Sequence, residues 1–373
     1  MQDAREHSAG NADGQEPKQE RERQPEQELV EEPHIRGKVV NLILLILAFA
    51  LLCVYLFVGG EAGELSEAVN DIRWTWLTLA VMMVVLYWVL ESVCVQIFAN
   101  RMHPGFKFWK TNIVTVIGQY FNCVTPLSSG GQPFQAYYYS RFGMPYSKSI
   151  PMLLCRFISY QLSTTTFCAI VLLARFTYFT EDNPALMTLV IIGFIGGLGL
   201  MTMLLMLAFW RKGTQHAVHV ILRLGGKLRL VKDAEASIAN ADKQIFDAYR
   251  EIQFLLHEPK LLAQSSAVTF IQLAEYFSIS YVIYRGFGYS TADPLSIISC
   301  QAFVYMISSF IPTPGAVGAA EGSYALFFST IYPNSAVVAL STFIWRLLTF
   351  YFPIVAGMLA TLLVNHSKSI SER

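Results

Sequence analysis

Five charged side chains stand in apolar segments of this sequence well away from the segment ends. They are two arginines and three glutamates, namely Arg156, Arg346, Glu91, Glu275 and Glu321. A charge at the middle of a bilayer costs about 2.5 to 3.5 kcal/mol on insertion scales, so such residues are usually paired or turned towards a cavity. The planar fork of a guanidinium group suits phosphate. The arginines are therefore candidates for binding an anionic lipid headgroup. The glutamates are candidates for tuning the arginines, carrying protons or meeting a cationic headgroup.

The same five residues have a structural alternative. Ion pairs between the glutamates and the arginines would lock two repeats of the chain together, and removing one member of a buried pair is costly. Both uses stay open for each of the five residues.

Two polar segments that contain proline and glycine interrupt the apolar runs at corresponding places. The first reads NCVTPLSSGGQPFQAYYYSRFG from residue 122, and the second reads FIPTPGAVGAAEGSYALFFSTIY from residue 310. The identical positions, each at an offset of 188, are Thr125 and Thr313, Pro126 and Pro314, and Gly130 and Gly318. Broken helices at membrane depth are tolerated only where protein or a water-filled cavity satisfies the backbone, and paired breaks in two halves point to a transport site.

The residues of the two breaks divide into two groups. The first group offers neutral hydrogen-bonding side chains to a ligand and comprises Ser128, Ser129, Gln132 and Gln135. The second group is expected to be the scaffold of the breaks and comprises Thr125, Pro126, Gly130, Gly131, Thr313, Pro314, Gly315 and Gly318. Helix ends and free backbone amides at such turns attract anions, which agrees with a phosphate ligand.

Composition explains why these segments belong in a membrane. Of the 373 residues 54% are hydrophobic and only 14% are charged, and several apolar runs of about 20 residues can each span a bilayer. Residues 1–38 hold ten acidic and six basic side chains, which leaves the remainder mildly basic. Residues 1–37 are too polar to bury a core, so we expect a disordered cytoplasmic tail there and a short cytoplasmic tail at 365–373.

The order of apolar runs and charged loops predicts an all-α polytopic membrane protein. We expect six full spans, at 39–58, 74–99, 149–179, 184–210, 261–284 and 335–364, and two re-entrant helical hairpins, at 108–146 and 294–332. Loops rich in lysine and arginine face the cytoplasm, which places both termini there. The long polar stretch 211–260 is then cytoplasmic. Its isoleucines Ile238, Ile245 and Ile252 recur every seven residues and predict an amphipathic helix on the membrane or on the protein.

The same charge rule makes the first hairpin enter from the cytoplasm and the second from outside. That is the requirement for an inverted repeat within the membrane domain 38–364, with repeat 1 at about 74–179 and repeat 2 at about 261–364. Arg156 corresponds to Arg346 at an offset of 190, and Glu91 corresponds to Glu275 at an offset of 184.

Several kinds of chemistry lack a motif in the sequence. The six cysteines form no CxxC pair and the seven histidines no HExxH, so no metal site and no cofactor are expected. No nucleophile, base and orienting residue form a recognisable set, so no catalytic residue is assigned. No nucleotide-binding motif occurs, and no nucleic-acid partner is expected.

With these features in place, the segments TPLSSGGQPFQAYYYSRFGMP and IPTPGAVGAAEGSYALFF resemble the two signature segments of the flippase-like, lysylphosphatidylglycerol synthase transmembrane family. The resemblance covers about residues 38–364. It implies a bacterial inner-membrane protein that moves a phospholipid or a lipid-linked precursor between leaflets. Many members carry acidic residues where Cys155 and Ser159 stand here, so the charge network around Arg156 is expected to differ.

Three functions follow as hypotheses. The leading one is a non-enzymatic lipid translocator with an anionic headgroup near Arg156, Arg346 and the hairpins. The resemblance also implies an alternative, a phosphatidylglycerol lysyltransferase or an accessory to a separate synthase, although we expect this chain to lack the soluble synthase domain of the bifunctional members. A membrane scaffold or receptor is the third, and the oligomeric state stays open.

Overall fold

The computed structural model describes residues 46, 49–50, 52–54, 56, 62–182, 184–227, 234–309 and 311–371, all of which belong to one compact unit, residues 41–373. The described residues are helical almost throughout, and their only extended pairing is one isolated bridge. The prediction of an all-α polytopic membrane protein is therefore confirmed. The tail expected at 1–37 lies outside the described residues, as does most of the first span expected at 39–58.

Four helices of the described ranges are long and apolar enough to cross a membrane. They are α3 (Trp74–Met102), α6 (Tyr146–Ala174), α10 (Pro259–Gly286) and a composite helix, Ser335–His366. The composite helix consists of α13 (Ser335–Arg346), the π-helical turn η2 (Leu347–Tyr351) and most of α14 (Phe352–Ser371). A further apolar helix, α7, runs over Pro184–Phe209.

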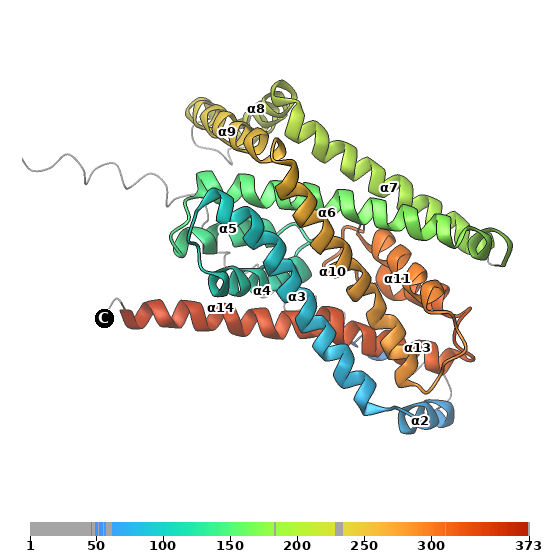
Figure 1. Cartoon of the computed structure of the whole chain (residues 1–373). Coiled ribbons are helices and arrows are strands. Elements are labelled where there is room, and N and C mark those ends of the chain that lie inside the picture. The colour runs from blue at the N-terminus through green and yellow to red at the C-terminus, as the bar shows by residue number, and fades with distance from the viewer. Residues whose placement is uncertain are drawn as a thin grey trace, which may run out of the picture. The chain divides into compact units, whose positions relative to one another are not determined.

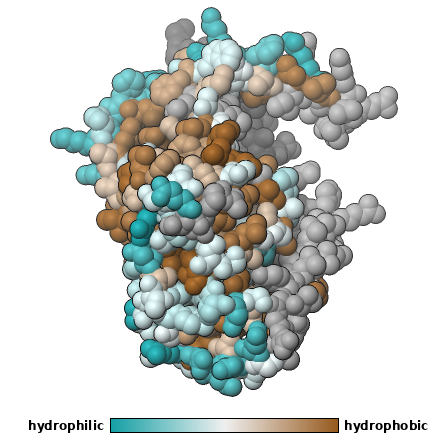
Figure 2. All heavy atoms as spheres, turned by 90° about the vertical axis from the view of Figure 1, so that its right-hand side faces the viewer, coloured by the Kyte–Doolittle hydropathy of each residue, from teal (hydrophilic) through white to brown (hydrophobic). Residues whose placement is uncertain are grey.

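Large apolar side chains cover the outward faces of these helices. Met82 on α3 is 57% exposed, Ile195 on α7 is 65% exposed and Leu363 on α14 is 71% exposed. On the face seen in Figure 2, hydrophobic side chains spread over the middle and hydrophilic ones collect at the lower margin. Exposed apolar surface on this scale suits contact with lipid acyl chains rather than with water.

Two helical hairpins form where the sequence predicts the breaks. The first consists of α4 (Phe108–Val124) and α5 (Gly131–Arg141), and the second of α11 (Pro294–Ser308) and α12 (Ala319–Phe328). Left-handed backbone occurs in each turn, with φ of 54° and 51° at Leu127 and Ser128 and of 59° and 89° at Gly315 and Gly318. Proline contributes to both breaks because it has no amide hydrogen to donate.

The tips of the two hairpins meet. Pro126 and Pro314 form the isolated antiparallel bridge of the described chain, although they are 188 positions apart in sequence. Each hairpin also has a helical neighbour, since α4 packs on α14 and α11 packs on α7. The two helix breaks predicted from the sequence are therefore in contact with each other in the structure.

The helices that precede the hairpins, α3 and α10, lie side by side in opposite directions (Figure 1). At one end the Arg73 amide donates to the Gly286 carbonyl oxygen at 2.8 Å. At the other end Arg101 binds Glu258 at 2.7 Å. The helices α3 and α10 therefore run antiparallel, which is what the predicted inverted repeat requires of them.

The polar stretch 211–260 holds two helices rather than one, α8 (Arg211–Lys227) and α9 (Ala234–Leu256). They pack on each other, and His219 contacts Asp242 at 2.9 Å between them. Ile252 and Leu255 of α9 are buried in the apolar cluster that includes residues of α6. The apolar face of α9 is therefore used on the protein. Upstream of α3, the loop predicted before position 74 also contains a short helix, α2 (Ala62–Asn70).

Candidate functional site

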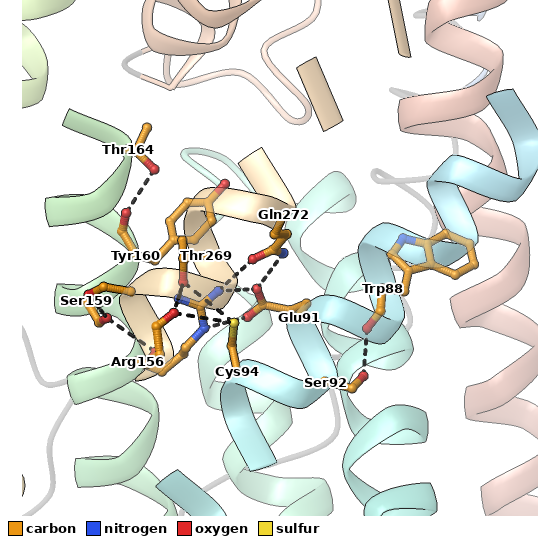
Figure 3. A network of polar contacts seen from close by, with 12 residues as sticks. Trp88, Glu91, Ser92, Cys94, Arg156, Ser159, Tyr160, Thr164, Thr269 and Gln272 are labelled. Atoms are coloured by element: carbon orange, nitrogen blue, oxygen red, sulfur yellow. Dashed lines mark hydrogen bonds and ion pairs between the residues drawn. The ribbon is translucent and has the colours of Figure 1, made fainter. Parts of the chain in front are cut away.

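Arg156 lies at the centre of a polar network between three helices. It is 3% exposed and projects from α6. Its Nη2 lies 2.5 Å from Glu91 Oε2 and its Nε lies 3.2 Å from Glu91 Oε1. Nη1 donates to Thr269 Oγ1 at 3.1 Å, and Nη2 also donates to Gln272 Oε1 at 3.1 Å. The guanidinium group is therefore held by a carboxylate from α3 and by two neutral side chains from α10 (Figure 3).

Gln272 closes this network into a triangle. Its amide nitrogen donates to Glu91 Oε2 at 2.9 Å while its carbonyl oxygen accepts from Arg156. Thr269 is fixed in turn because its hydroxyl donates to the Ser265 carbonyl oxygen at 2.7 Å. The expectation that ion pairs link the two repeats is wrong for both pairs, since Glu91 with Arg156 lies within 74–179 and Glu321 with Arg346 within 261–364. The link from Arg156 to the second range is made by the neutral side chains of Thr269 and Gln272.

Arg346 forms the corresponding site in repeat 2. It is 4% exposed at the end of α13, and its Nε donates to Glu321 Oε1 at 2.6 Å. Its Nη2 donates to the Gly315 carbonyl oxygen at 2.9 Å. The other oxygen of Glu321 accepts from the Gly318 amide at 2.7 Å. One ion pair therefore fixes both ends of the second hairpin turn, because Gly315 is the first residue of the turn and Gly318 is its last residue and the N-cap of α12.

The two arginine sites differ in the origin of the carboxylate. Arg156 uses Glu91 from the helix before its hairpin, whereas Arg346 uses Glu321 from the hairpin itself. Glu275 is the repeat counterpart of Glu91. Both of its carboxylate oxygens are shielded from solvent and have no hydrogen-bond partner among the described residues. The structure thus brings together four of the five predicted charges as two pairs and leaves Glu275 apart.

The first hairpin turn is held by its own polar groups. Thr125 Oγ1 accepts from the Gly130 amide at 2.8 Å, and Asn122 Oδ1 accepts from the Gly131 amide at 3.0 Å. The Ser129 hydroxyl donates to the Pro126 carbonyl oxygen at 2.9 Å. Thr125, Gly130 and Gly131 therefore act as scaffold. In the second turn the Thr313 hydroxyl similarly donates to the Val317 carbonyl oxygen at 3.2 Å.

The polar residues predicted beside the first turn separate in the structure. Ser128 and Ser129 are exposed at the tip, and Gln132 is half-buried in the first turn of α5. Gln135 is only 8% exposed and stands so close to Gly118 of α4 that a Cβ there would overlap its side chain. Gln135 therefore packs the hairpin together.

A tyrosine cluster extends the network of Arg156 towards the second hairpin. Arg156 lies over the Tyr160 ring with 5.0 Å from Cζ to the ring centroid, and the Tyr160 and Tyr305 hydroxyls are 2.9 Å apart. The Tyr276 ring centroid lies 6.1 Å from that of Tyr305 and 4.7 Å from that of Tyr87. Four helices, α3, α6, α10 and α11, thus contribute one hydroxyl-bearing aromatic side chain each.

The two partners of Arg156 on α10, Thr269 and Gln272, were not predicted from the sequence. Ser265, Thr269, Gln272 and Tyr276 follow one another at spacings of four, three and four residues along an apolar helix. That spacing places them on one face. A polar stripe on a membrane-spanning helix was therefore a usable signal for a polar interface.

The site supplies positive charge, neutral hydrogen-bonding groups and exposed turn backbone. Among the residues that the structure describes, no three His, Cys, Asp or Glu side chains come together in a metal-binding arrangement. The described chemistry is suited to holding a charged polar group inside an apolar unit.

Sequence comparisons relate the chain to known proteins. The family profile described as "Lysylphosphatidylglycerol synthase TM region" matches residues 41–357, which include both hairpins and both arginines. An Archaeoglobus fulgidus protein named "UPF0104 membrane protein" is 23% identical over 303 residues, which cover 81% of this chain and 89% of that protein. A Mycoplasma pneumoniae protein named "Uncharacterized protein MG306 homolog" is 26% identical over 105 residues, or 27% of each chain.

Proposed function

Because the chain belongs to the lysylphosphatidylglycerol synthase transmembrane family, we propose that this multi-pass membrane protein is a lipid translocator. It moves a phospholipid or a lipid-linked precursor between the leaflets of the membrane by alternating access between its inverted repeats. We place it in a bacterial cell membrane with both termini in the cytoplasm, because loops rich in lysine and arginine usually face the cytoplasm.

The observation that carries this proposal is the meeting of the two hairpin tips. Pro126 and Pro314 pair there, and residues 126–129 are exposed within a unit whose helices are largely apolar. In transporters built from inverted repeats, substrate binds at the repeat interface, where broken helices offer backbone groups. A polar headgroup would find hydrogen-bonding partners at this point inside the membrane.

The anionic part of the headgroup binds Arg346 beside the second turn. The contacts that hold Arg346 use Nε and Nη2, whereas those of Arg156 use all three guanidinium nitrogens. A phosphate can therefore approach Arg346 with less rearrangement. Ser128 and Ser129 lie in the facing tip and add hydrogen-bonding groups, while Arg156 holds α3, α6 and α10 together.

The test is lipid exchange by the purified full chain in liposomes. Fluorescent anionic, zwitterionic and lysyl-bearing phospholipids are placed in both leaflets, and a membrane-impermeant reductant bleaches the outer leaflet. We expect bleaching to continue into the inner-leaflet pool only when the protein is present, and fastest for an anionic lipid. Exchange of none of these lipids by natively folded protein would overturn the proposal and favour a scaffold or receptor.

Two variants locate the headgroup. Arg346→Gln should abolish exchange, and Arg346→Lys should restore only part of it because an ammonium group lacks the two-pronged geometry. Arg101→Gln is the matched control, since Arg101 pairs with Glu258 on the surface and 43% of its side chain is exposed. Equal exchange by Arg346→Gln and Arg101→Gln would place the headgroup elsewhere.

A further inference from the structure

Glu275 is a charged residue of a membrane-spanning helix that the proposed translocation does not use. It lies in the middle of α10, where both carboxylate oxygens are shielded from solvent and make no hydrogen bond within the described parts of the chain. An isolated carboxylate in such surroundings is strongly disfavoured as an ion, whereas the protonated acid is neutral. The burial itself therefore favours a bound proton.

The described neighbours of α10 do not supply a counter-charge. The helices packed against α10 carry several charged or tyrosine side chains, among them Tyr87 and Glu91 of α3, Arg156 and Tyr160 of α6, Tyr305 of α11 and Arg346 of α13. Arg156 is engaged by Glu91, and Arg346 is engaged by Glu321 and the Gly315 carbonyl oxygen. None of these groups bonds Glu275.

The ligand that fits is a proton rather than a metal cation. Sodium, magnesium and calcium require several oxygen ligands around the ion. Among the residues that the structure describes, no three His, Cys, Asp or Glu side chains come together around Glu275 in a metal-binding arrangement. A proton needs only one of the two oxygens.

We propose that Glu275 is a proton-binding site that couples lipid movement to a proton gradient, an inference that rests on the proposed lipid translocation. In the conformation described here the carboxyl group carries the proton. The step that releases this proton follows from the correspondence between the two repeats.

In alternating access, two inverted repeats exchange their conformations. Glu91 and Arg156 form an ion pair in the first repeat, and their counterparts in the second repeat are Glu275 and Arg346. After the exchange, Glu275 and Arg346 would therefore pair in the same way. In the opposite conformation Arg346 leaves Glu321 and binds Glu275, while the Glu321 carboxylate stays ionised and keeps its hydrogen bond from the Gly318 amide. The O–H bond of the Glu275 carboxyl then breaks, the proton passes to water on one side of the membrane, and the carboxylate is stabilised by the guanidinium group. Return of Arg346 to Glu321 accompanies uptake of a proton from the other side.

Infrared spectroscopy of the purified full chain tests the proton site without lipid transport. At neutral pH the wild type should show the carbonyl band of a protonated carboxylic acid that makes no hydrogen bond. Glu275→Gln should lack this band, whereas Glu64→Gln, which alters an exposed carboxylate on α2, should keep it. A wild-type spectrum without the band, or a band unchanged by Glu275→Gln, would overturn the assignment.

A pH gradient across the liposomes tests the coupling. With one proton per lipid, one pH unit should drive accumulation of lipid in one leaflet by about tenfold. Glu275→Gln should still exchange lipid but lose this response, and Glu275→Asp should retain part of it because the side chain can still titrate.

The two proposals fail in different ways. Wild-type protein that exchanges lipid without any response to the gradient would overturn the coupling and leave lipid translocation standing. Absence of exchange under every condition would overturn translocation and its coupling together, while the infrared band would still decide whether Glu275 holds a proton.

Discussion

At the scale of single residues, the pair of Arg156 and Glu91 is shielded from water, with 4% and 14% of the two side chains exposed. Replacing Arg156 by glutamine would leave the Glu91 carboxylate buried without its cation. Loss of one member of a buried ion pair costs about 3 to 5 kcal/mol. We expect Arg156→Gln to lower the free energy of unfolding by that amount, measured by denaturant titration in detergent micelles.

Two further variants show whether the loss comes from the unpaired charge. The double variant Arg156→Gln with Glu91→Gln removes both charges and should recover part of the stability. Arg101→Gln breaks a surface pair with Glu258 and should lower the free energy of unfolding by no more than about 1 kcal/mol. If Arg156→Gln and Arg101→Gln lowered the free energy of unfolding by similar amounts, the buried pair would contribute no more to stability than the surface pair.

A substitution at Gly315 tests whether the second turn needs a residue without a Cβ. Its φ of 59° is unfavourable for residues with a Cβ, and a Cβ there would lie 2.6 Å from Phe350 Cδ2. The left-handed conformation alone costs roughly 1 to 2 kcal/mol. We expect Gly315→Ala to lower the midpoint of thermal unfolding and to weaken lipid exchange, because the Gly315 carbonyl oxygen is also a partner of Arg346.

A matched control exists in the same hairpin. Gly322 lies within α12, and a Cβ added there would have no heavy atom within 4 Å. Gly322→Ala should therefore raise stability by about 0.5 to 1 kcal/mol, since alanine favours helix. A drop of equal size in both variants would show that the hairpin tolerates no added methyl group, and the argument from φ at Gly315 would fail.

At the scale of elements, the two hairpins are joined at their tips. Cα atoms of paired antiparallel residues lie about 4.5 to 5.5 Å apart. That range is inside the span of about 4.4 to 6.8 Å found in disulfides. Pro126→Cys with Pro314→Cys, in a background where the six native cysteines are replaced, should therefore form a disulfide under mild oxidation.

The disulfide can be detected after cleavage at a protease site inserted between α8 and α9. The two fragments should then stay together on a gel until a reductant is added. If the tips separate during transport, the oxidised protein should also stop exchanging lipid and recover after reduction. Each single-cysteine variant serves as the control. Halves that separate without reductant would contradict the contact between the tips.

At the scale of the whole molecule, the antiparallel course of α3 and α10 predicts opposite membrane faces for the loops that follow them. Lys107 lies in the loop after α3 and Ser290 in the loop after α10, and both are exposed. With a membrane-impermeant thiol reagent on intact cells, Ser290→Cys should react and Lys107→Cys should react only after the cells are opened. Reaction of both from the same side would rule out the inverted arrangement.

Much of the architecture could be predicted from residue patterns. Apolar runs placed a span at 74–99 where α3 covers Trp74–Met102, and proline with glycine placed the breaks that separate α4 from α5 and α11 from α12. Such features depend on residues near one another in the chain. In the stretch 211–260 the prediction gave one helix, which corresponds to α9. The preceding helix, α8, was missed because only the isoleucine spacing of α9 was used.

The candidate site was predictable in its charges but not in all its partners. The two arginines and their depth in apolar segments were visible in the sequence, and so was the correspondence between Glu91 and Glu275. Repeat symmetry would have paired Arg346 with Glu275. The structure pairs it with Glu321, which lies in the hairpin and also binds the Gly318 amide.

The order of residues therefore decides which segments enter the membrane, where they break and which charges they carry, because hydropathy and backbone preference act locally. Which carboxylate reaches which guanidinium group depends on the rotation and depth of helices that are far apart in the chain, such as α3 and α6 around a pair 65 residues apart. Only the tertiary structure could decide that Glu91 and Glu321 are paired, that the two hairpin tips touch, and that Glu275 is left without a described partner.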